Sequence, residues 1–192
     1  MINQLLWPFQ NLPNSYVVVD TETTGLFDEQ GAPGIASLGV ASVRNGSVAE
    51  TNEYHLRPHR PMTAEAFKVN GISNKQAQGY PFFSSQWPEI REWLDGQLVV
   101  IHNAEFDWPL IIDHVERYQV EPPSATGVFC SQRAAQPWAK AMRLKCSKRG
   151  PSLDTLTQAL GVENLRMLNS GIHGAIIDAR QTAAVIEAFR RL

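Results

Sequence analysis

The sequence is poor in cysteine and has no excess of basic residues. Cys130 and Cys146 are the only thiols among 192 residues, too few for a disulfide framework or a paired metal motif. Seventeen Lys and Arg residues stand against nineteen Asp and Glu, giving a formal charge of −2. This balance disfavours a protein that coats nucleic acid through a broad positive field, because such binding depends on many basic contacts to phosphate. Any nucleic-acid contact is expected to be local.

Long hydrophobic runs are also absent near the N-terminus. The apolar residues there are interrupted at Pro8, and no basic segment precedes them, so we expect neither a membrane span nor a secretion signal. Together with the cysteine usage, this predicts a reducing, cytoplasmic location without membrane contact. With 43% hydrophobic residues and no internal repeat or linker, the chain is expected to form a single domain over residues 1–192.

Hydrophobic patterning predicts an α/β fold with a mixed sheet and helices on its faces. An Asn-Gly pair at residues 45–46 indicates a hairpin between the second and third strands. Pro88 is acceptable only in the first turn of its helix, and Pro109 requires the next helix to start late or bend. Strands are expected at 16–20, 35–43, 48–56, 98–101 and 128–129. Helices are expected from 63 until Gly71 ends the helix, and at 86–94, 110–118, 131–141, 152–161 and 175–191.

Acidic residues follow the first and fourth predicted strands. Asp20 and Glu22 are two residues apart, so on an extended strand both carboxylates can face one point. Asp107 falls in the first turn of a predicted helix, where the helix dipole favours an acid even without a metal. Glu105 faces another direction on that helix. Each feature alone has an ordinary explanation, as a polar loop or a helix start.

A third cluster combines a histidine with an acid. His173 lies in a predicted loop between Gly171 and Gly174, and an imidazole can accept a proton near neutral pH. Asp178 lies one turn into the last predicted helix. A lone pair of this kind is usually surface or capping chemistry, so its meaning depends on the other two clusters.

Taken together, the three clusters resemble the exonuclease motifs of the DnaQ-like, DEDDh superfamily. The matching segments are Asp20-Thr-Glu, His102-Asn-Ala-Glu-Phe-Asp107 and His173-Gly-Ala-Ile-Ile-Asp178, in the family's order and with similar separations. The resemblance covers about residues 15–190. It is greatest to the proofreading subunit of bacterial DNA polymerase III and to exodeoxyribonuclease X, through residues 21–26, 65–72, 100–104 and 152–156.

The resemblance implies a ribonuclease H-like fold with a mixed five-stranded sheet in the order 3-2-1-4-5, strand 2 being antiparallel. It implies a metal-dependent 3′-to-5′ exonuclease that releases nucleoside 5′-monophosphates. Asp20, Glu22, Asp107 and Asp178 correspond to the acids that hold two divalent cations, and His173 corresponds to the general base. Oxygen ligands suit Mg²⁺ or Mn²⁺.

The loop after Glu22 is the expected cradle for the terminal nucleotide, as similar positions are in the family. An ordinary strand-exit turn is the alternative for this loop, and a core position is the alternative for Phe67. The expected substrate-binding residues are Thr23, Thr24, Gly25, Leu26, Phe67, Asn70 and Asn103.

Basic residues concentrate in one segment, 140–149. Such a run is usually a solvated face, but beside a nuclease cleft it can attract phosphates upstream of the scissile bond. Both alternatives stay open. The segment contains Lys140, Arg143, Lys145, Lys148 and Arg149.

The expected substrate is a nucleic-acid 3′ end, preferably single-stranded DNA, because the first motif is most similar to the proofreading and exodeoxyribonuclease branches. An exoribonuclease remains the alternative. A catalytically inactive binding module is disfavoured, since all four acids and the histidine are present. A DNA polymerase is the candidate protein partner, although the chain ends directly after its last predicted helix and a stand-alone role is equally open. Cys130-Ser-Gln132 departs from the family's acid-containing pattern and leaves the exit of the fifth strand uncertain.

Overall fold

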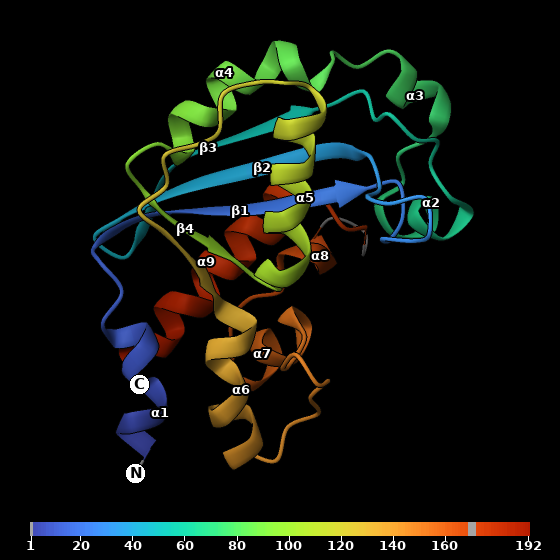
Figure 1. Ribbon diagram of the computed structural model, residues 1–192. Helices are drawn as coiled ribbons and strands as arrows, with labels where there is room; N and C mark the ends of the chain where they lie inside the picture. The colour runs from blue at the N-terminus through green and yellow to red at the C-terminus, as the bar shows by residue number, and fades with distance from the viewer. Residues whose placement is uncertain (1, 169–171) are drawn as a thin grey trace.

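The structure, a computed structural model, describes residues 2–168 and 172–192; Gly171, expected beside His173, lies outside them. Its centre is a five-stranded sheet in the order β3-β2-β1-β4-β5 (Figure 1). β2 is antiparallel to β1 and β3, and β4 and β5 run parallel to β1. The expected ribonuclease H-like sheet is therefore confirmed. The strands are β1 Ser15–Thr23, β2 Ile35–Arg44, β3 Ser47–His55, β4 Leu98–Ile101 and β5 Gly127–Cys130.

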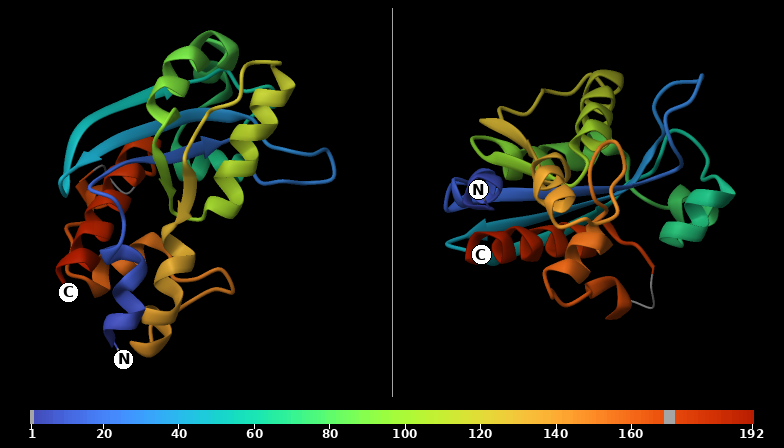
Figure 2. Two further views of the ribbon diagram at one scale, coloured as in Figure 1. Left: turned by 60° about the vertical axis from the view of Figure 1, so that its left-hand side comes forward. Right: turned by 90° about the horizontal axis from the view of Figure 1, so that it is seen from below.

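Helices cover both faces of the sheet. One layer contains α4 and α5, and the other contains α9 and α7, as the view from below shows (Figure 2). α1 and α6 contribute to the same core cluster as α9. The helices are α1 Ile2–Gln10, α2 Ala64–Asn70, α3 Asn74–Gln78, α4 Phe83–Leu94, α5 Ala104–Arg117, α6 Ser131–Ala141, α7 Leu153–Ala159, α8 Leu165–Leu168 and α9 Ala175–Arg191. None of the helices in the described ranges is long and apolar enough to cross a membrane.

β1 contributes alternate residues to the two cores. Val19 packs in the cluster with α4 and α5, whereas Val18 packs in the cluster with α9. β1 continues to Thr23, beyond its predicted end at residue 20. Because side chains two apart on a strand share a face, Asp20 and Glu22 lie on the α9 side of the sheet.

The β2–β3 turn matches its prediction. Asn45 and Gly46 have φ values of 49° and 76°, as a two-residue hairpin of the primed type requires. The pairing of β2 with β3 shifts register between Ser42 and Val43 and continues to the turn, with Arg44 opposite Ser47.

The helix starts were harder to predict than the helices themselves. α6 and α9 have the predicted bounds, but α4 begins at Phe83, so Pro88 lies in its second turn and the expectation of a first-turn position is wrong. Burial of Phe83 and Trp87 against the core compensates for the hydrogen bond that proline removes. α5 already begins at Ala104, which makes the late start considered for Pro109 wrong as well.

Three short helices were not predicted, namely α1, α3 and α8. α1 contains Pro8, which hides its pattern, yet Leu6 and Phe9 are buried. The Phe9 ring stacks on Phe189 of α9 with a centroid distance of 4.2 Å. Tertiary packing, rather than local propensity, thus stabilises α1.

Candidate active site

All five residues matched to the exonuclease motifs line one cavity of about 390 Å³. The four acids come from three elements that are distant in sequence and adjacent in space. Asp20 and Glu22 lie on β1, Asp107 lies in the first turn of α5, and Asp178 lies in the first turn of α9. His173 precedes α9. The fold therefore brings the predicted candidates together at one end of the sheet.

The close approach of α9 to the sheet depends on Gly39. Gly39 is the β2 partner of Asp20, and a Cβ there would collide with the backbone of Ala175 and Ile176. Without a side chain at this position, the first turn of α9 can lie directly against β2. This contact places Asp178 beside Asp20.

The site has a short-range geometry suited to ion binding. Single ligand atoms of Glu22, His173 and Asp178 lie within 4.8 Å of one another. His173 Nδ1 lies 3.5 Å from Asp178 Oδ2. The fourth acid, Asp107, is held separately: the Thr21 hydroxyl donates a 2.6 Å hydrogen bond to Asp107 Oδ1, which fixes that carboxylate.

Burial and mutual repulsion disfavour the charged forms of Asp20, Glu22 and Asp107. Burial, reinforced by Asp178, Asp107 and Glu22, raises the pKa of Asp20 well above its usual range. Burial and then Asp178 raise the pKa of Glu22 to about 8. Burial also raises the pKa of Asp107 to about 7, although the Thr21 hydroxyl opposes the shift. A carboxylate cluster with these properties favours binding of cations, which would remove the repulsion.

A residue that was not predicted, Arg166 on α8, binds into the acid cluster. Its Nε donates a 2.6 Å hydrogen bond to Asp178 Oδ1, and its Nη2 donates a 2.6 Å hydrogen bond to Asp178 Oδ2. Its Nη1 donates a 3.0 Å hydrogen bond to Asp154. Arg166 falls in a segment without a motif, so its sequence context gave no signal. Asp154 does lie within a segment quoted for the family resemblance.

His173 is half-buried at the edge of the cavity. Its backbone N–H donates to the Val69 carbonyl at 3.1 Å, which ties the segment before α9 to α2. Burial, and next the positive charge of Arg166, lowers the pKa of the imidazole below its usual value. The neutral form, which can accept a proton, therefore dominates at neutral pH.

A second, more apolar pocket of about 500 Å³ adjoins Glu22. Its floor is the end of β1 and its wall is α2. Asn70 is buried and its Nδ2 donates to the Thr23 carbonyl at 3.2 Å, which joins these two elements. Of the residues expected to contact substrate, Thr23, Gly25, Leu26 and Asn70 line this pocket.

The remaining expected substrate residues lie elsewhere. The Thr24 N–H donates to the Gly34 carbonyl and the Thr24 hydroxyl accepts from the Gly34 N–H, at 2.9 Å each. Because Thr24 is also buried, it holds the loop and does not face a ligand. Phe67 is 48% exposed, which makes the core position considered for it wrong, and it is not among the residues that line the pocket. Asn103 lines the acidic cavity and adopts a left-handed φ of 76° before α5.

The basic segment lies next to Asn103. Arg149 donates a 3.3 Å hydrogen bond to the Asn103 side chain, and Gln136 of α6 holds the Lys148 carbonyl at 2.8 Å. All five basic side chains of the segment are exposed. Glu105, in contrast, pairs with Arg133 on the surface and does not line the acidic cavity.

Residues 130–132, which differ from the family's acid-containing pattern, lead from β5 into α6 without an intervening loop. β5 ends at Cys130 and α6 begins at Ser131. The Ser131 hydroxyl lies 3.0 Å from Nδ1 of His102, and burial lowers the pKa of this histidine to about 4. His102 is therefore a neutral residue that joins β4 to α6 beside the cavity.

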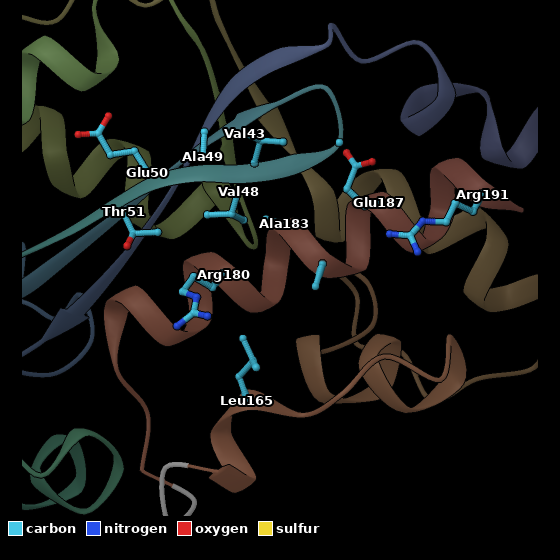
Figure 3. Close-up of a pocket in the computed structure, with 12 residues that line it drawn as sticks. Val43, Val48, Ala49, Glu50, Thr51, Leu165, Arg180, Ala183, Glu187 and Arg191 are labelled. Carbon is cyan, nitrogen blue, oxygen red and sulfur yellow. The ribbon is translucent and has the colours of Figure 1, made fainter.

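A further cavity, of about 670 Å³, lies between β3 and α9 (Figure 3). It shares no lining residue with the acidic cavity. Its charged side chains have both signs, including Glu187 and Arg191, and in Figure 3 they are spread along the helix and the strand. Nothing there converges on one point as the acids do, so the acidic cavity is the candidate active site.

The sheet order and the acids at the ends of β1, α5 and α9 define a ribonuclease H-like nuclease. A family model described as RNase_T, Exonuclease, matches residues 17–186, and the chain belongs to this exonuclease family. The resemblance to DnaQ-like, DEDDh exonucleases is thereby confirmed.

Relatives and solved structures agree with this assignment. The DNA polymerase III subunit epsilon of Escherichia coli is 31% identical over 174 residues, covering 88% of this chain and 68% of that protein. Exonuclease X in complex with 5′ overhanging duplex DNA shares the fold with a TM-score of 0.63 and 22% identity, covering 92% of this chain and 91% of that chain. Escherichia coli Exonuclease I in complex with a dT13 oligonucleotide has a TM-score of 0.72 and 18% identity, over 91% and 40% of the two chains.

Proposed function

We propose that this protein is a metal-dependent exonuclease that removes nucleotides from the 3′ ends of DNA and releases nucleoside 5′-monophosphates, with residues 1–192 acting as one domain in the cytoplasm. The observation that carries the proposal is the convergence of Asp20, Glu22, Asp107, Asp178 and His173 on one cavity in a chain of the exonuclease family. DNA as substrate is supported by the similarity to a DNA polymerase subunit. The same similarity makes a DNA polymerase the partner to test.

The residues present fit a pair of hard divalent cations. Four carboxylates supply oxygen ligands, which Mg²⁺ and Mn²⁺ prefer, and Arg166 already places a positive charge on one of them. Asp20, Glu22, Asp107 and Asp178 would hold the ions. When bound, two such ions supply the positive charge that stabilises both the attacking and the leaving oxygen of a phosphodiester.

His173 is assigned the role of general base. Asp178 lies near Nδ1 and favours a proton on that nitrogen, so Nε2 keeps the lone pair that accepts the proton of the attacking water. The electron pair of the broken P–O bond goes to the departing 3′-oxygen of the penultimate nucleotide, which becomes the new 3′ end of the strand. The released terminal nucleotide carries the phosphate on its 5′-oxygen. Thr21 fixes Asp107 in the orientation that this arrangement requires.

The apolar pocket beside Glu22 is proposed to hold the terminal nucleoside. Its volume, about 500 Å³, lies within the range of pockets that enclose small molecules. Leu26 is 75% exposed at its rim and can pack against a base, while the half-buried Thr23 hydroxyl, which donates to the Gly25 carbonyl, can still accept a hydrogen bond. A 3′-terminal nucleotide in this pocket would place its 5′-phosphate next to the acids.

The decisive experiment is digestion of 5′-labelled single-stranded DNA, duplex DNA and RNA in parallel, with Mg²⁺ or with EDTA. We expect a ladder that shortens from the 3′ end, fastest on single-stranded DNA, with mononucleotide products and no activity in EDTA. Full-length label with every substrate and with either Mg²⁺ or Mn²⁺ would refute the function. Faster shortening of the RNA would instead favour the exoribonuclease alternative.

The exposed basic segment 140–149 is expected to attract the phosphates upstream of the scissile bond, because Arg149 contacts Asn103 in the cavity wall. Replacing its five basic residues by Gln should raise the KM for single-stranded DNA about tenfold. Each lost phosphate contact should also reduce the slope of log affinity against log salt by about 0.7. The measurement is binding of catalytically inactive protein to labelled DNA over a range of salt concentrations.

A matched variant removes exposed basic residues outside the cavity and should leave KM and the salt slope unchanged. Five suitable positions are Arg44, Arg57, Lys75, Arg117 and Arg191. Equal slopes for the two variants and the wild type would show that the basic segment is only a solvated face.

A further inference from the structure

Arg166 makes a bidentate contact to one of the candidate metal ligands. Its guanidinium binds both oxygens of Asp178 in a parallel fork, with two bonds of 2.6 Å. Both side chains are withdrawn from water, at 13% and 5% exposure. A bidentate, charge-assisted pair of this kind is stronger than an ordinary surface ion pair. While the fork is closed, neither oxygen of Asp178 is fully available to another cation.

The same guanidinium also reaches an acid at the rim of the cavity. Nη1 of Arg166 lies 3.0 Å from Asp154, whose side chain is 56% exposed. Arg166 is thus shared between a buried acid that belongs to the site and an exposed acid that does not belong to the predicted ligand set. Release from Asp178 would not leave the guanidinium unpaired.

The helix that carries Arg166 is weakly anchored. α8 has four residues, and two of them, Met167 and Leu168, are more than 70% exposed. Its start is held to α9 by a hydrogen bond from the Leu165 N–H to the Gln181 side chain at 2.7 Å. A short helix with little buried apolar surface can shift at a small free-energy cost.

We infer that Arg166 is an internal cation that competes with a divalent ion for Asp178 and transfers to Asp154 when the ion binds. This inference rests on the proposed metal-dependent function. In the metal-free protein, Arg166 offsets part of the repulsion among the acids. The closed fork lowers the fraction of molecules with an available Asp178, and the apparent metal affinity falls by that fraction.

The first test is Mn²⁺ binding to the full chain, followed by loss of the free-ion EPR signal at one fixed pH. If the fork is closed in about nine of ten molecules, Arg166→Gln should lower the apparent Kd roughly tenfold. Arg91→Gln is the control, because Arg91 pairs with Glu121 far from the acids, and it should bind as the wild type does. An unchanged or weaker affinity in Arg166→Gln would overturn the inference alone. Absence of Mn²⁺ binding in every protein would overturn the metal-dependent function with it.

Thermal unfolding gives a second readout that does not depend on activity. In EDTA, Arg166→Gln should unfold at a lower temperature than the wild type, because the acids lose their internal counter-ion. Saturating Mn²⁺ should remove this difference. A deficit that persists in Mn²⁺ would identify Arg166 as an ordinary structural residue and contradict the competition.

Transfer to Asp154 is tested by a double-mutant cycle. Asp154→Asn should weaken Mn²⁺ binding in the wild type, since Arg166 then has only Asp178 as a partner, and should have a smaller effect in the Arg166→Gln background. Equal effects in both backgrounds would contradict the transfer.

If Arg166→Gln fails to fold, the wild type still decides the question by NMR. The Nε–H signal of Arg166, assigned through its loss in Arg166→Lys, should be protected from exchange in EDTA and should shift when Mg²⁺ is added. An Nε–H signal whose chemical shift and protection do not change at saturating Mg²⁺ would overturn the inference.

Discussion

Asp20→Asn is expected to reduce the exonuclease rate by about 10³-fold or more while making the metal-free protein more stable. Burial raises the pKa of Asp20, and the neighbouring Asp178, Asp107 and Glu22 reinforce the shift. Loss of a metal ligand at the reacting phosphate removes several kcal/mol of transition-state stabilisation, and about 4 kcal/mol corresponds to a factor of about 10³. The rate is measured on 5′-labelled single-stranded DNA with saturating Mg²⁺.

The stability gain depends on pH, with a definite sign. Because the folded-state pKa of Asp20 lies above its unfolded value, the folded protein retains extra protons between the two, and its stability falls as pH rises through this interval. Asp20→Asn removes this pH-dependent loss of folding stability, because asparagine does not titrate. In EDTA, the variant should therefore unfold at a higher temperature than the wild type, by on the order of 5 °C, and the gap should widen with increasing pH.

Glu105→Gln is the matched control for Asp20→Asn. Glu105 lies in the first turn of α5, close in sequence to Asp107, but pairs with Arg133 on the surface. Its replacement should change the rate by less than about twofold and should not raise stability. An Asp20→Asn variant that keeps one tenth of the wild-type rate, or that is less stable in EDTA, would show that Asp20 is a structural residue and not a metal ligand.

The strands and the last helix could be predicted because their signal is local. Val18 and Val19 lie in a β-branched run that suits a strand buried on both faces, and the apolar positions of α9 repeat at helical spacing. The acids were predictable for a related reason, because their spacing in short motifs resembles a known family. Convergence of Asp20, Asp107 and Asp178 then followed from the expected sheet order.

Features that depend on tertiary contacts could not be predicted. Arg166 has the local sequence of a surface arginine, and only the fold shows that α8 lies against the start of α9 and reaches Asp178. The hydroxyl of Thr24 was expected to contact substrate, but in the fold it is buried and accepts a hydrogen bond from the Gly34 N–H. α1 is stabilised by packing of Phe9 on α9, to which the proline in its sequence gives no clue.

His173→Ala should reduce turnover by about 10²- to 10⁴-fold, the range that general acid–base catalysis contributes, and should leave the affinity for DNA within a few-fold of wild type. Burial and Arg166 lower the pKa of His173, so the wild-type imidazole is neutral and active at neutral pH. Single-turnover rates and equilibrium binding of labelled DNA separate the two effects. His55→Ala is the control, because His55 is exposed on β3 and stacks on Tyr80 away from the acids.

The pH profile distinguishes a general base from a structural histidine. With the imidazole present, the rate should be level near neutral pH and should fall only below the ordinary histidine pKa of about 6.5, since the pKa of His173 is shifted downward. Without it, water must be deprotonated by solvent, so the residual rate of His173→Ala should rise with pH across the range where the wild type is level. Because the side chain is 35% exposed, added imidazole can enter the space it vacates and should restore part of the rate. If His173→Ala keeps the wild-type pH–rate profile and gains no activity from added imidazole, another group is the general base. The pH dependence of the rate follows the titration of the group that accepts the proton, so removal of that group must change the profile.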